Sequence, residues 1–301
     1  MRTPLVRLPD TDVYLKLECL QPIGSFKIRG ATNAIRSAPP EATRAGVVTA
    51  SAGNMAQGVA WAARELGVPA TIVVPDHAPE TKVAAIERLG GRVLKVPFDE
   101  WWRTLEESHH DGLDGLFVHP VQDPRVMAGN GTIGLELLED LPDPDAVLIP
   151  FGGGGLTAGI ASVLRQLSPA TRVYTVEPET AAPFAASLKA GSRQEVEYRP
   201  SFVDGAGGRL VLPRMWTQLE GLVDEGLVAT LEETAAAVRL LADRVRVIAE
   251  GAGALALAAA QTLQQTVAKP GKPARTLVCI VSGGNIDFAK LTSILGGETP
   301  R

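Results

Sequence analysis

The segment AVLIPFGGGGLTAGIASVLRQLSPATRVYTVE, residues 146–177, decides the fold class. A β-branched run (146–150) leads into four glycines, a helix-like stretch (157–167) and a second β-branched run (172–177). A strand, a helix and another strand in this order form a parallel βαβ unit. The segment therefore predicts a parallel sheet whose glycine loop lies at the carboxyl end of a strand, where open α/β sheets bind ligands.

The same alternation continues along the rest of the chain. Further short β-branched runs are VVTA (47–50), TIVVP (71–75), VLKV (93–96) and TLVCIV (276–281). Stretches of helical pattern are MAQGVAWAARELG (55–67), TKVAAIERLGG (81–91) and EETAAAVRLLADRV (232–245), the last preceded by a capping-box pair, Thr230 and Glu233. The pattern predicts an α/β fold with mostly parallel, twisted sheets and helices on both faces.

Composition excludes several classes of function. The net charge is −5, with no long run of one sign, so we expect neither a nucleic-acid nor a membrane partner. No charge-free apolar stretch of about 20 residues occurs, and the N-terminus lacks an apolar signal core. The chain has two cysteines, Cys19 and Cys279, so we expect no disulfide framework and a cytoplasmic location.

Residues 46–124 contain three or four compact strand–helix units and could form a lobe of their own. The sequence predicts a small domain of residues 46–124 and a large domain of residues 1–45 and 125–301.

The glycine loop, Gly152 to Gly155, favours phosphate binding, because glycines let the backbone approach an anion at a helix N-terminus. The same loop fits the dinucleotide pattern G-x-G-x-x-A through Gly153, Gly155 and Ala158. Glu177 ends the next strand about 20 residues further on, as a nicotinamide site requires. A nicotinamide-dependent oxidoreductase is therefore an alternative from another class.

Two further loops follow strands. In TASAGNMAQG, Ser51, Gly53 and Asn54 would lie at a helix N-terminus, where they favour a carboxylate or else cap the helix. In VSGGNID, Ser282 could hydrogen-bond a ring or simply begin a turn.

GSFKIRG, residues 24–30, sets Lys27 between two apolar residues. An isolated lysine of this kind is usually a strand-edge residue with a solvated head, but burial lowers the pKa of an amine and makes it reactive. A lysine, a carboxylate loop, a phosphate loop and a ring-contacting serine are together the parts that hold pyridoxal phosphate and an amino acid.

At these residues the chain resembles the fold-type II pyridoxal-phosphate enzymes (tryptophan synthase β-like), in particular the threonine/serine dehydratase and serine racemase group. The matching segments occur in family order and span nearly the whole chain: LKLECLQPIGSFKIRGA (15–31), TASAGNMAQGVA (49–60), DPRVMAGNGTIGLELL (123–138), IPFGGGGLTAGIA (149–161), VEP (176–178), DGAGG (204–208), EGAGALALAAA (250–260) and VSGGNID (281–287). The resemblance implies a two-domain fold, a homodimer and an amino-acid substrate.

The resemblance also implies residue roles. Lys27 would bond to the cofactor aldehyde, Phe26 would pack beside the ring, and Asn54 would bind the ring hydroxyl. Ser282 would meet the pyridine nitrogen. The resemblance assigns the cofactor phosphate to Gly152, Gly153, Gly154, Gly155 and Leu156. It assigns the substrate to Ser51, Ala52, Gly53, Asn54 and Met55, and the backbone of these residues would bind the substrate carboxylate.

Departures from the family pattern refine the expectation. Racemases of this group carry a second serine where this chain has Ala52, so we expect elimination rather than racemisation. Met55 replaces a usual histidine and could reshape the pocket. Some members bind a divalent cation near the VEP motif, but here Ala181, Ala182 and Pro183 follow Glu177, so we expect no metal. The same match keeps open an active-site role for Glu250, which opens a helix.

The expected activity is β-elimination of a small β-hydroxy amino acid, L-threonine or L-serine, to a 2-oxo acid and ammonia. Alternatives within the family are a hydroxyaspartate dehydratase, a serine racemase and a β-replacement enzyme. A pyridoxal-phosphate-binding pseudoenzyme is a further alternative.

Overall fold

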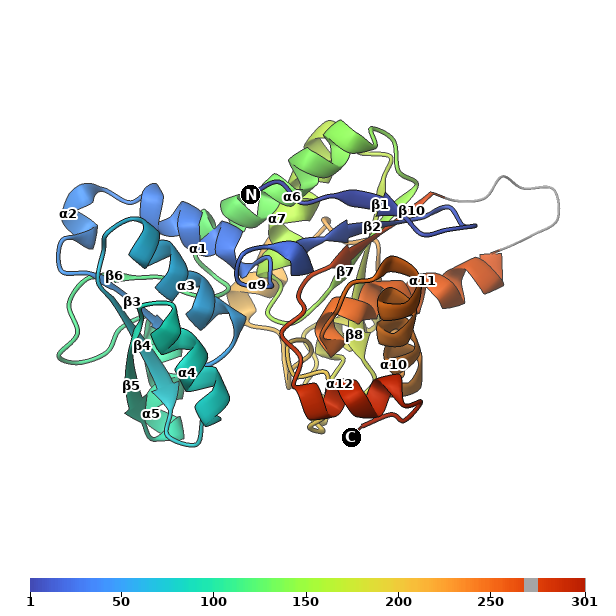
Figure 1. The fold of residues 1–301 in the computed structure, drawn as a ribbon. Helices are drawn as coiled ribbons and strands as arrows, with labels where there is room; N and C mark the ends of the chain where they lie inside the picture. Colours follow the sequence, from blue (N-terminus) through green and yellow to red (C-terminus); the bar gives the residue numbers. More distant parts are fainter. Residues whose placement is uncertain (268–275, 301) are drawn as a thin grey trace. The chain divides into compact units, whose positions relative to one another are not determined.

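The computed structural model describes residues 1–267 and 276–300, and contacts divide the chain into two compact units (Figure 1). Unit 1 comprises Met1–Leu20 and Ile133–Arg301, and unit 2 comprises Gln21–Thr132. Unit 2 is larger than the lobe expected at 46–124, since residues 21–45 and 125–132 group with it. The division into a cofactor-binding domain and a small domain stays a prediction.

Unit 1 contains a six-stranded sheet in the order β1-β2-β10-β7-β8-β9. Its strands are β1 (Leu5–Arg7), β2 (Val13–Leu17), β7 (Ala146–Pro150), β8 (Arg172–Pro178), β9 (Glu225–Ala229) and β10 (Leu277–Val281). All neighbours pair in parallel except β1 with β2. The strands predicted at 146–150, 172–177 and 276–281 are confirmed.

The helical segments of unit 1 are η1 (Glu18–Leu20), α7 (Gly155–Leu167), α8 (Pro183–Ala190), α9 (Pro213–Leu219), α10 (Leu231–Leu240), the π-helical turn η2 (Leu241–Val245), α11 (Gly251–Val267) and α12 (Phe288–Leu295). The helix α6 (Pro124–Asp140) contains the division between the units. The predicted capping box is confirmed: Thr230 and Glu233 exchange side-chain hydrogen bonds at the start of α10.

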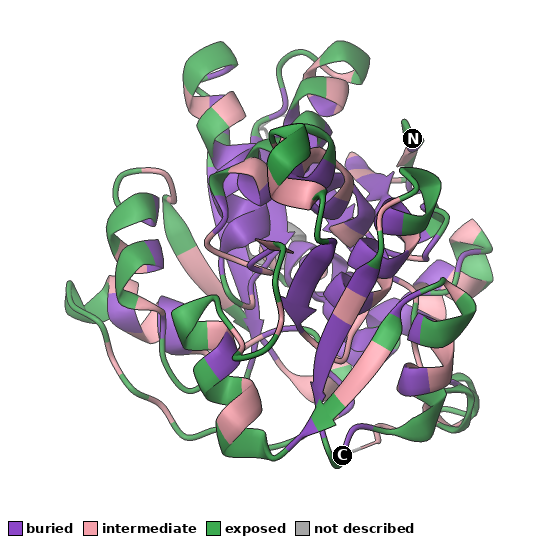
Figure 2. Ribbon diagram, turned by 90° about the vertical axis from the view of Figure 1, so that its left-hand side faces the viewer, coloured by how far each residue is buried: buried purple, intermediate pink, exposed green. Residues whose placement is uncertain are grey.

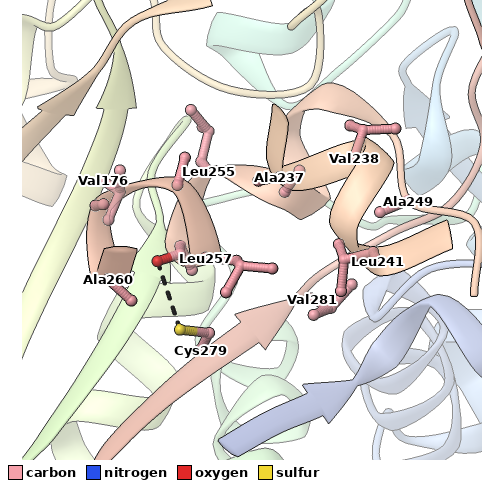
Figure 3. Close-up of a cluster of buried hydrophobic side chains, with 14 of the residues drawn as sticks. Val176, Ala237, Val238, Leu241, Ala249, Leu255, Leu257, Ala260, Cys279 and Val281 are labelled. Atoms are coloured by element: carbon pink, nitrogen blue, oxygen red, sulfur yellow. Dashed lines mark hydrogen bonds between the residues drawn. The ribbon is translucent and has the colours of Figure 1, made fainter. Parts of the chain in front are cut away.

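The core of unit 1 lies between its sheet and the helices α10 and α11. Figure 3 shows part of it, with Val176 of β8 near Leu255 and Ala260 of α11, and Val281 of β10 near Leu241 of η2. The Cys279 thiol donates to the Ala256 carbonyl oxygen (3.5 Å), and burial raises its pKa. Cys19 is also buried and lies in η1.

Unit 2 contains a parallel four-stranded sheet in the order β5-β4-β3-β6. Its elements are α1 (Lys27–Arg36), α2 (Pro40–Thr43), β3 (Val47–Ala50), α3 (Asn54–Glu65), β4 (Ala70–Pro75), α4 (Glu80–Arg88), β5 (Arg92–Val96), α5 (Phe98–Glu107) and β6 (Leu116–Phe117). The strands predicted at 47–50, 71–75 and 93–96 are confirmed. A second hydrophobic core joins α1 and α3 to β3 and β4. In Figure 2 the strands and the inner faces of the helices are largely buried, whereas the outer turns are exposed.

Within the described part of the chain, no helix has the length and apolar character needed to cross a membrane.

Candidate functional site

The glycine loop of unit 1 joins β7 to α7, and its lack of side chains lets a ligand approach the backbone closely. Gly154, the residue preceding α7, has a φ of 91°, which L side chains rarely adopt. A Cβ placed there would lie 3.0 Å from the Leu219 Cδ1 and 3.2 Å from the Phe151 ring. No side chain of the described residues caps α7. The loop therefore offers a helix N-terminus to an anion, and it fits a phosphate.

The segment 204–208 lies against this loop. A Cβ on Gly152 would lie 3.3 Å from the Gly205 oxygen, and one on Gly205 would lie 3.6 Å from the Glu250 Oε1. Glu250 is 7% exposed. The structure thus places the Glu250 carboxylate one loop away from the glycines, which supports the role that the sequence left open.

Ser282 directly follows β10 and is buried, with 4% of its surface exposed. The loop that begins there is held by α11: the Glu250 N–H donates to the Gly283 oxygen (3.0 Å), and a Cβ on Gly253 would collide with that oxygen. Unit 1 therefore brings the glycine loop, the segment 204–208 and the serine loop together around Glu250.

In unit 2, Lys27 is the first residue of α1 and not a strand-edge residue. Its side chain is half-buried. The Nζ lies 5.2 Å from the centroid of the Phe26 ring and donates to the Pro120 carbonyl oxygen (3.2 Å). The amine is thereby held between an aromatic face and a fixed acceptor.

The loop Ser51–Asn54 follows β3, and Gly53 immediately precedes α3. Capping by Ser51 or Asn54, the alternative left open, is absent: α3 receives no side-chain cap from the residues described. Instead, the Ser51 Oγ accepts the Gly53 N–H (3.3 Å). An uncapped helix N-terminus of this kind suits a carboxylate.

α3 contacts α1 at Lys27. A Cβ on Gly58 would lie 3.2 Å from the Lys27 carbonyl oxygen, and Gly58 is one helical turn from Asn54. Unit 2 therefore brings Lys27 and the predicted carboxylate loop together.

Ala52 and Met55 take different positions in this loop. Ala52 is half-buried and packs against the core of unit 2, whereas Met55 lies inside that core with 2% of its surface exposed. Because its side chain is in the core, Met55 can serve a substrate through its backbone N–H.

Glu177 is fully buried at the end of β8, and its carboxylate accepts the N–H groups of Phe184 (3.1 Å) and Ala185 (2.7 Å). Burial raises its pKa to about 7. The Phe184 ring stacks on Phe151 (centroids 4.3 Å apart) and meets Trp216 edge-on. Since Glu177 anchors α8, it is not available to the ribose that the dinucleotide alternative needs. Over residues 1–267 and 276–300, no group of three His, Cys, Asp or Glu could hold a metal.

Sequence reasoning missed His119. Its Nδ1 accepts the N–H groups of Val121 (3.0 Å) and Gln122 (2.9 Å), and it precedes the Pro120 whose oxygen accepts the Lys27 amine. The available signal was a His-Pro pair followed by polar residues, which is typical of a turn.

An anion-binding glycine loop in unit 1 and an amine beside a helix N-terminus in unit 2 are features of an α/β enzyme with a phosphorylated cofactor. Residues 1–283 match the family model described as pyridoxal-phosphate dependent enzyme, and the chain belongs to this family. It is a fold-type II member, and pyridoxal phosphate is its cofactor.

Within this family, the chain is similar to threonine ammonia-lyases and to a serine racemase. An L-threonine ammonia-lyase of Thermotoga maritima is 40% identical over 94% of this chain and 70% of its own length. A structure of the processed form of threonine deaminase isoform 2 from Solanum lycopersicum has a TM-score of 0.89 and 37% identity, covering 98% of this chain and 88% of that one. Maize serine racemase has a TM-score of 0.87 and 31% identity, covering 99% and 92%.

Proposed function

We propose that this protein is a pyridoxal-phosphate-dependent ammonia-lyase that converts L-threonine, and also L-serine, to a 2-oxo acid and ammonia. The observation that carries the proposal is the packing, within unit 2, of α3 against α1 at the Lys27 backbone, one helical turn from the loop that precedes α3. An α-amino acid presents the two complementary groups, an amine and a carboxylate. The threonine ammonia-lyase and threonine deaminase relatives support this choice of substrate.

The cofactor would be held by the residues that the family resemblance assigns to it. In our proposal Lys27 bonds to its aldehyde, Phe26 lies beside the ring, and Asn54 binds the ring hydroxyl. Ser282 meets the pyridine nitrogen, and the backbone of Gly152–Leu156 binds the phosphate. The glycine cradle at Gly154, which a Cβ would fill, fits this group. When bound, pyridoxal phosphate supplies an electron sink for the bonds at Cα.

The chain's own residues then have separable tasks. Backbone N–H groups of Ser51–Met55 bind the substrate carboxylate and fix Cα. The Lys27 amine, released when the substrate amine takes its place, would remove the Cα proton. The β-hydroxyl leaves as water, and the resulting enamine is hydrolysed by water to the 2-oxo acid and ammonia, so the overall change is the loss of ammonia.

Ala52 argues against racemisation. Racemisation needs a proton donor on the face of Cα opposite the base, and a methyl group packed on the core cannot donate one. The likeness to maize serine racemase is therefore one of fold and cofactor site rather than of outcome. Hydroxyaspartate dehydration and binding without turnover stay as alternatives that the substrate panel below separates, and β-replacement stays as a further alternative.

From the resemblance we further propose a cytoplasmic homodimer. Light scattering on the purified holoenzyme should give twice the chain mass of 31.7 kDa.

The deciding experiment measures 2-oxo acid release from L-threonine, L-serine, D-serine and 3-hydroxyaspartate by the cofactor-loaded protein. We expect release from L-threonine and L-serine, unchanged by a chelator. Release from 3-hydroxyaspartate alone would transfer the assignment to that substrate. Cofactor binding with no release from any of them would reject the lyase.

A further inference from the structure

The turn after β6 has an unusual organiser. His119 is 7% exposed, and its Nδ1 accepts two consecutive backbone N–H groups, from Val121 and Gln122. Two N–H donors converging on one ring nitrogen require that nitrogen to be unprotonated, so the ring is neutral and carries its proton on Nε2. His119 therefore acts on this turn as an aspartate or asparagine side chain acts in an Asx-turn.

The residue enclosed by this turn is the one that touches the reactive lysine. Pro120 lies between His119 and the two donors, and its carbonyl oxygen accepts the Lys27 Nζ at 3.2 Å. The Pro120 ring restricts one backbone dihedral, and the two hydrogen bonds to His119 constrain the peptide that follows. The direction of the Pro120 carbonyl is thus set by the His119 ring.

We propose that His119 is a positioning residue for Lys27: it fixes the turn 119–122 so that the Pro120 carbonyl holds the Lys27 amine in the orientation needed to meet a carbonyl carbon or a Cα proton. The catalytic importance of this positioning rests on the function proposed above for Lys27. The link from His119 through Pro120 to Lys27 lies entirely within unit 2.

Two substitutions at His119 distinguish the effect of its hydrogen-bond acceptor from the effect of its ring size. His119→Asn keeps an acceptor two bonds from Cβ, which can bond N–H groups two and three residues on. His119→Phe keeps an aromatic ring but has no acceptor. His77, an exposed histidine of the same unit, gives the control pair His77→Asn and His77→Phe.

The first readout needs no cofactor. Lys27 in the apoprotein is labelled with a limiting amine-reactive reagent and quantified by mass spectrometry against Lys95, an exposed internal reference. Loss of one hydrogen bond corresponds to about a fivefold change in equilibrium. We expect Lys27 labelling to rise about fivefold in His119→Phe and to stay at the wild-type level in His119→Asn and both His77 variants.

The second readout is the rate at which added pyridoxal phosphate forms its visible Schiff-base band. It should fall in His119→Phe and be rescued in His119→Asn. Equal labelling and equal band formation in both His119 variants would overturn the proposal. Absence of the band in the wild type would reject the proposed function, while the labelling would still test the link to His119.

A third measurement needs no variant and covers the case in which His119→Phe does not fold. Two-bond proton–nitrogen correlation spectra of the ¹⁵N-labelled wild type report the tautomer of each histidine. We expect His119 to be neutral and protonated on Nε2. Protonation on Nδ1 would contradict the proposal outright.

Discussion

Lys27 owes its environment to its place at the start of a helix. The Phe26 ring and the Pro120 oxygen surround the amine, and the helix N-terminus at which Lys27 lies disfavours a further positive charge. The sequence suggested a strand-edge lysine for the isolated triplet, because local pattern does not report a carbonyl 93 residues away. The resemblance, and not the pattern, identified this residue.

Lys27→Ala should abolish both the Schiff-base absorbance and 2-oxo acid release, because no other amine is expected at the reacting carbon. The fold should persist, since the side chain is only half-buried. Absorbance of the pyridoxal-phosphate-treated variant and circular dichroism check the two statements. Lys95→Ala, at an exposed lysine, is the matched control. Turnover retained by Lys27→Ala would refute the assignment.

Glu177 should make stability depend on pH. Its folded pKa of about 7 lies above the model value of 4.5, so the folded state binds the proton more tightly. The favourable contribution is complete below pH 4.5 and is lost as the pH rises through 7. Over that interval the free energy of unfolding should fall by about 3 kcal/mol on account of this group.

Urea unfolding of the wild type and of Glu177→Gln from pH 4.5 to 8 measures this effect. The amide keeps the shape but does not titrate, so the difference between the two proteins should change by about 3 kcal/mol across the range. Glu197→Gln, at a surface glutamate, should track the wild type. Parallel curves for the wild type and Glu177→Gln would show that Glu177 does not titrate there.

At the scale of elements, the family motifs mark places where backbones touch. A Cβ on Gly129 of α6 would collide with the Arg29 oxygen of α1, and one on Gly253 of α11 would collide with the Gly283 oxygen. The first contact joins the lysine motif to the segment 123–138, and the second joins α11 to the serine loop. Each contact thus joins two of the segments that carry the family resemblance.

Gly154→Ala should weaken the affinity for pyridoxal phosphate at least tenfold. The new Cβ would meet Leu219 and Phe151 at a φ of 91°, so the loop must shift away from its anion-binding form. Fluorescence titration of the apoprotein measures the affinity. Gly191→Ala is matched for strain, with a φ of 68° and open space around the Cβ, and should lose stability of about 1 kcal/mol without losing affinity. Equal affinity in both variants would contradict the phosphate assignment.

The sequence predicted the long parallel strands but missed the four strands β1, β2, β6 and β9. β1 and β6 are too short to show a period, with three and two residues. β2 was missed although it alternates, because it contains Lys16, which is fully buried and paired with Glu136 (2.7 Å). A buried lysine is stable only when an acidic group pairs with it, and here Glu136 is 120 residues away in the sequence. Local sequence therefore does not reveal the pair.

For the whole molecule, each unit has its own hydrophobic core. The class of protein could be predicted from the sequence because eight motifs span the chain in order. The substrate side chain could not, because the residues that define its pocket depend on loop conformations rather than on periodicity. His119 escaped notice for the same reason.

Pyridoxal phosphate should stabilise the folded chain, because a ligand that binds the folded state shifts the unfolding equilibrium toward it. At a cofactor concentration about 100 times the dissociation constant, linkage predicts a gain of about 2.7 kcal/mol in the free energy of unfolding. Chemical denaturation with and without cofactor measures it. In Gly154→Ala the gain should shrink in proportion to the lost affinity. A cofactor-independent midpoint would exclude binding to the folded state.

The aromatic stack of Phe151, Phe184 and Trp216 has an optical consequence. Trp216 is the tryptophan of unit 1, whereas Trp61, Trp101 and Trp102 all belong to unit 2. A Trp216→Phe protein would therefore emit from unit 2 alone, while a protein retaining only Trp216 would emit from the neighbourhood of the glycine loop. Because the four tryptophans are divided in this way, the fluorescence of the two proteins during heating would report which unit unfolds first.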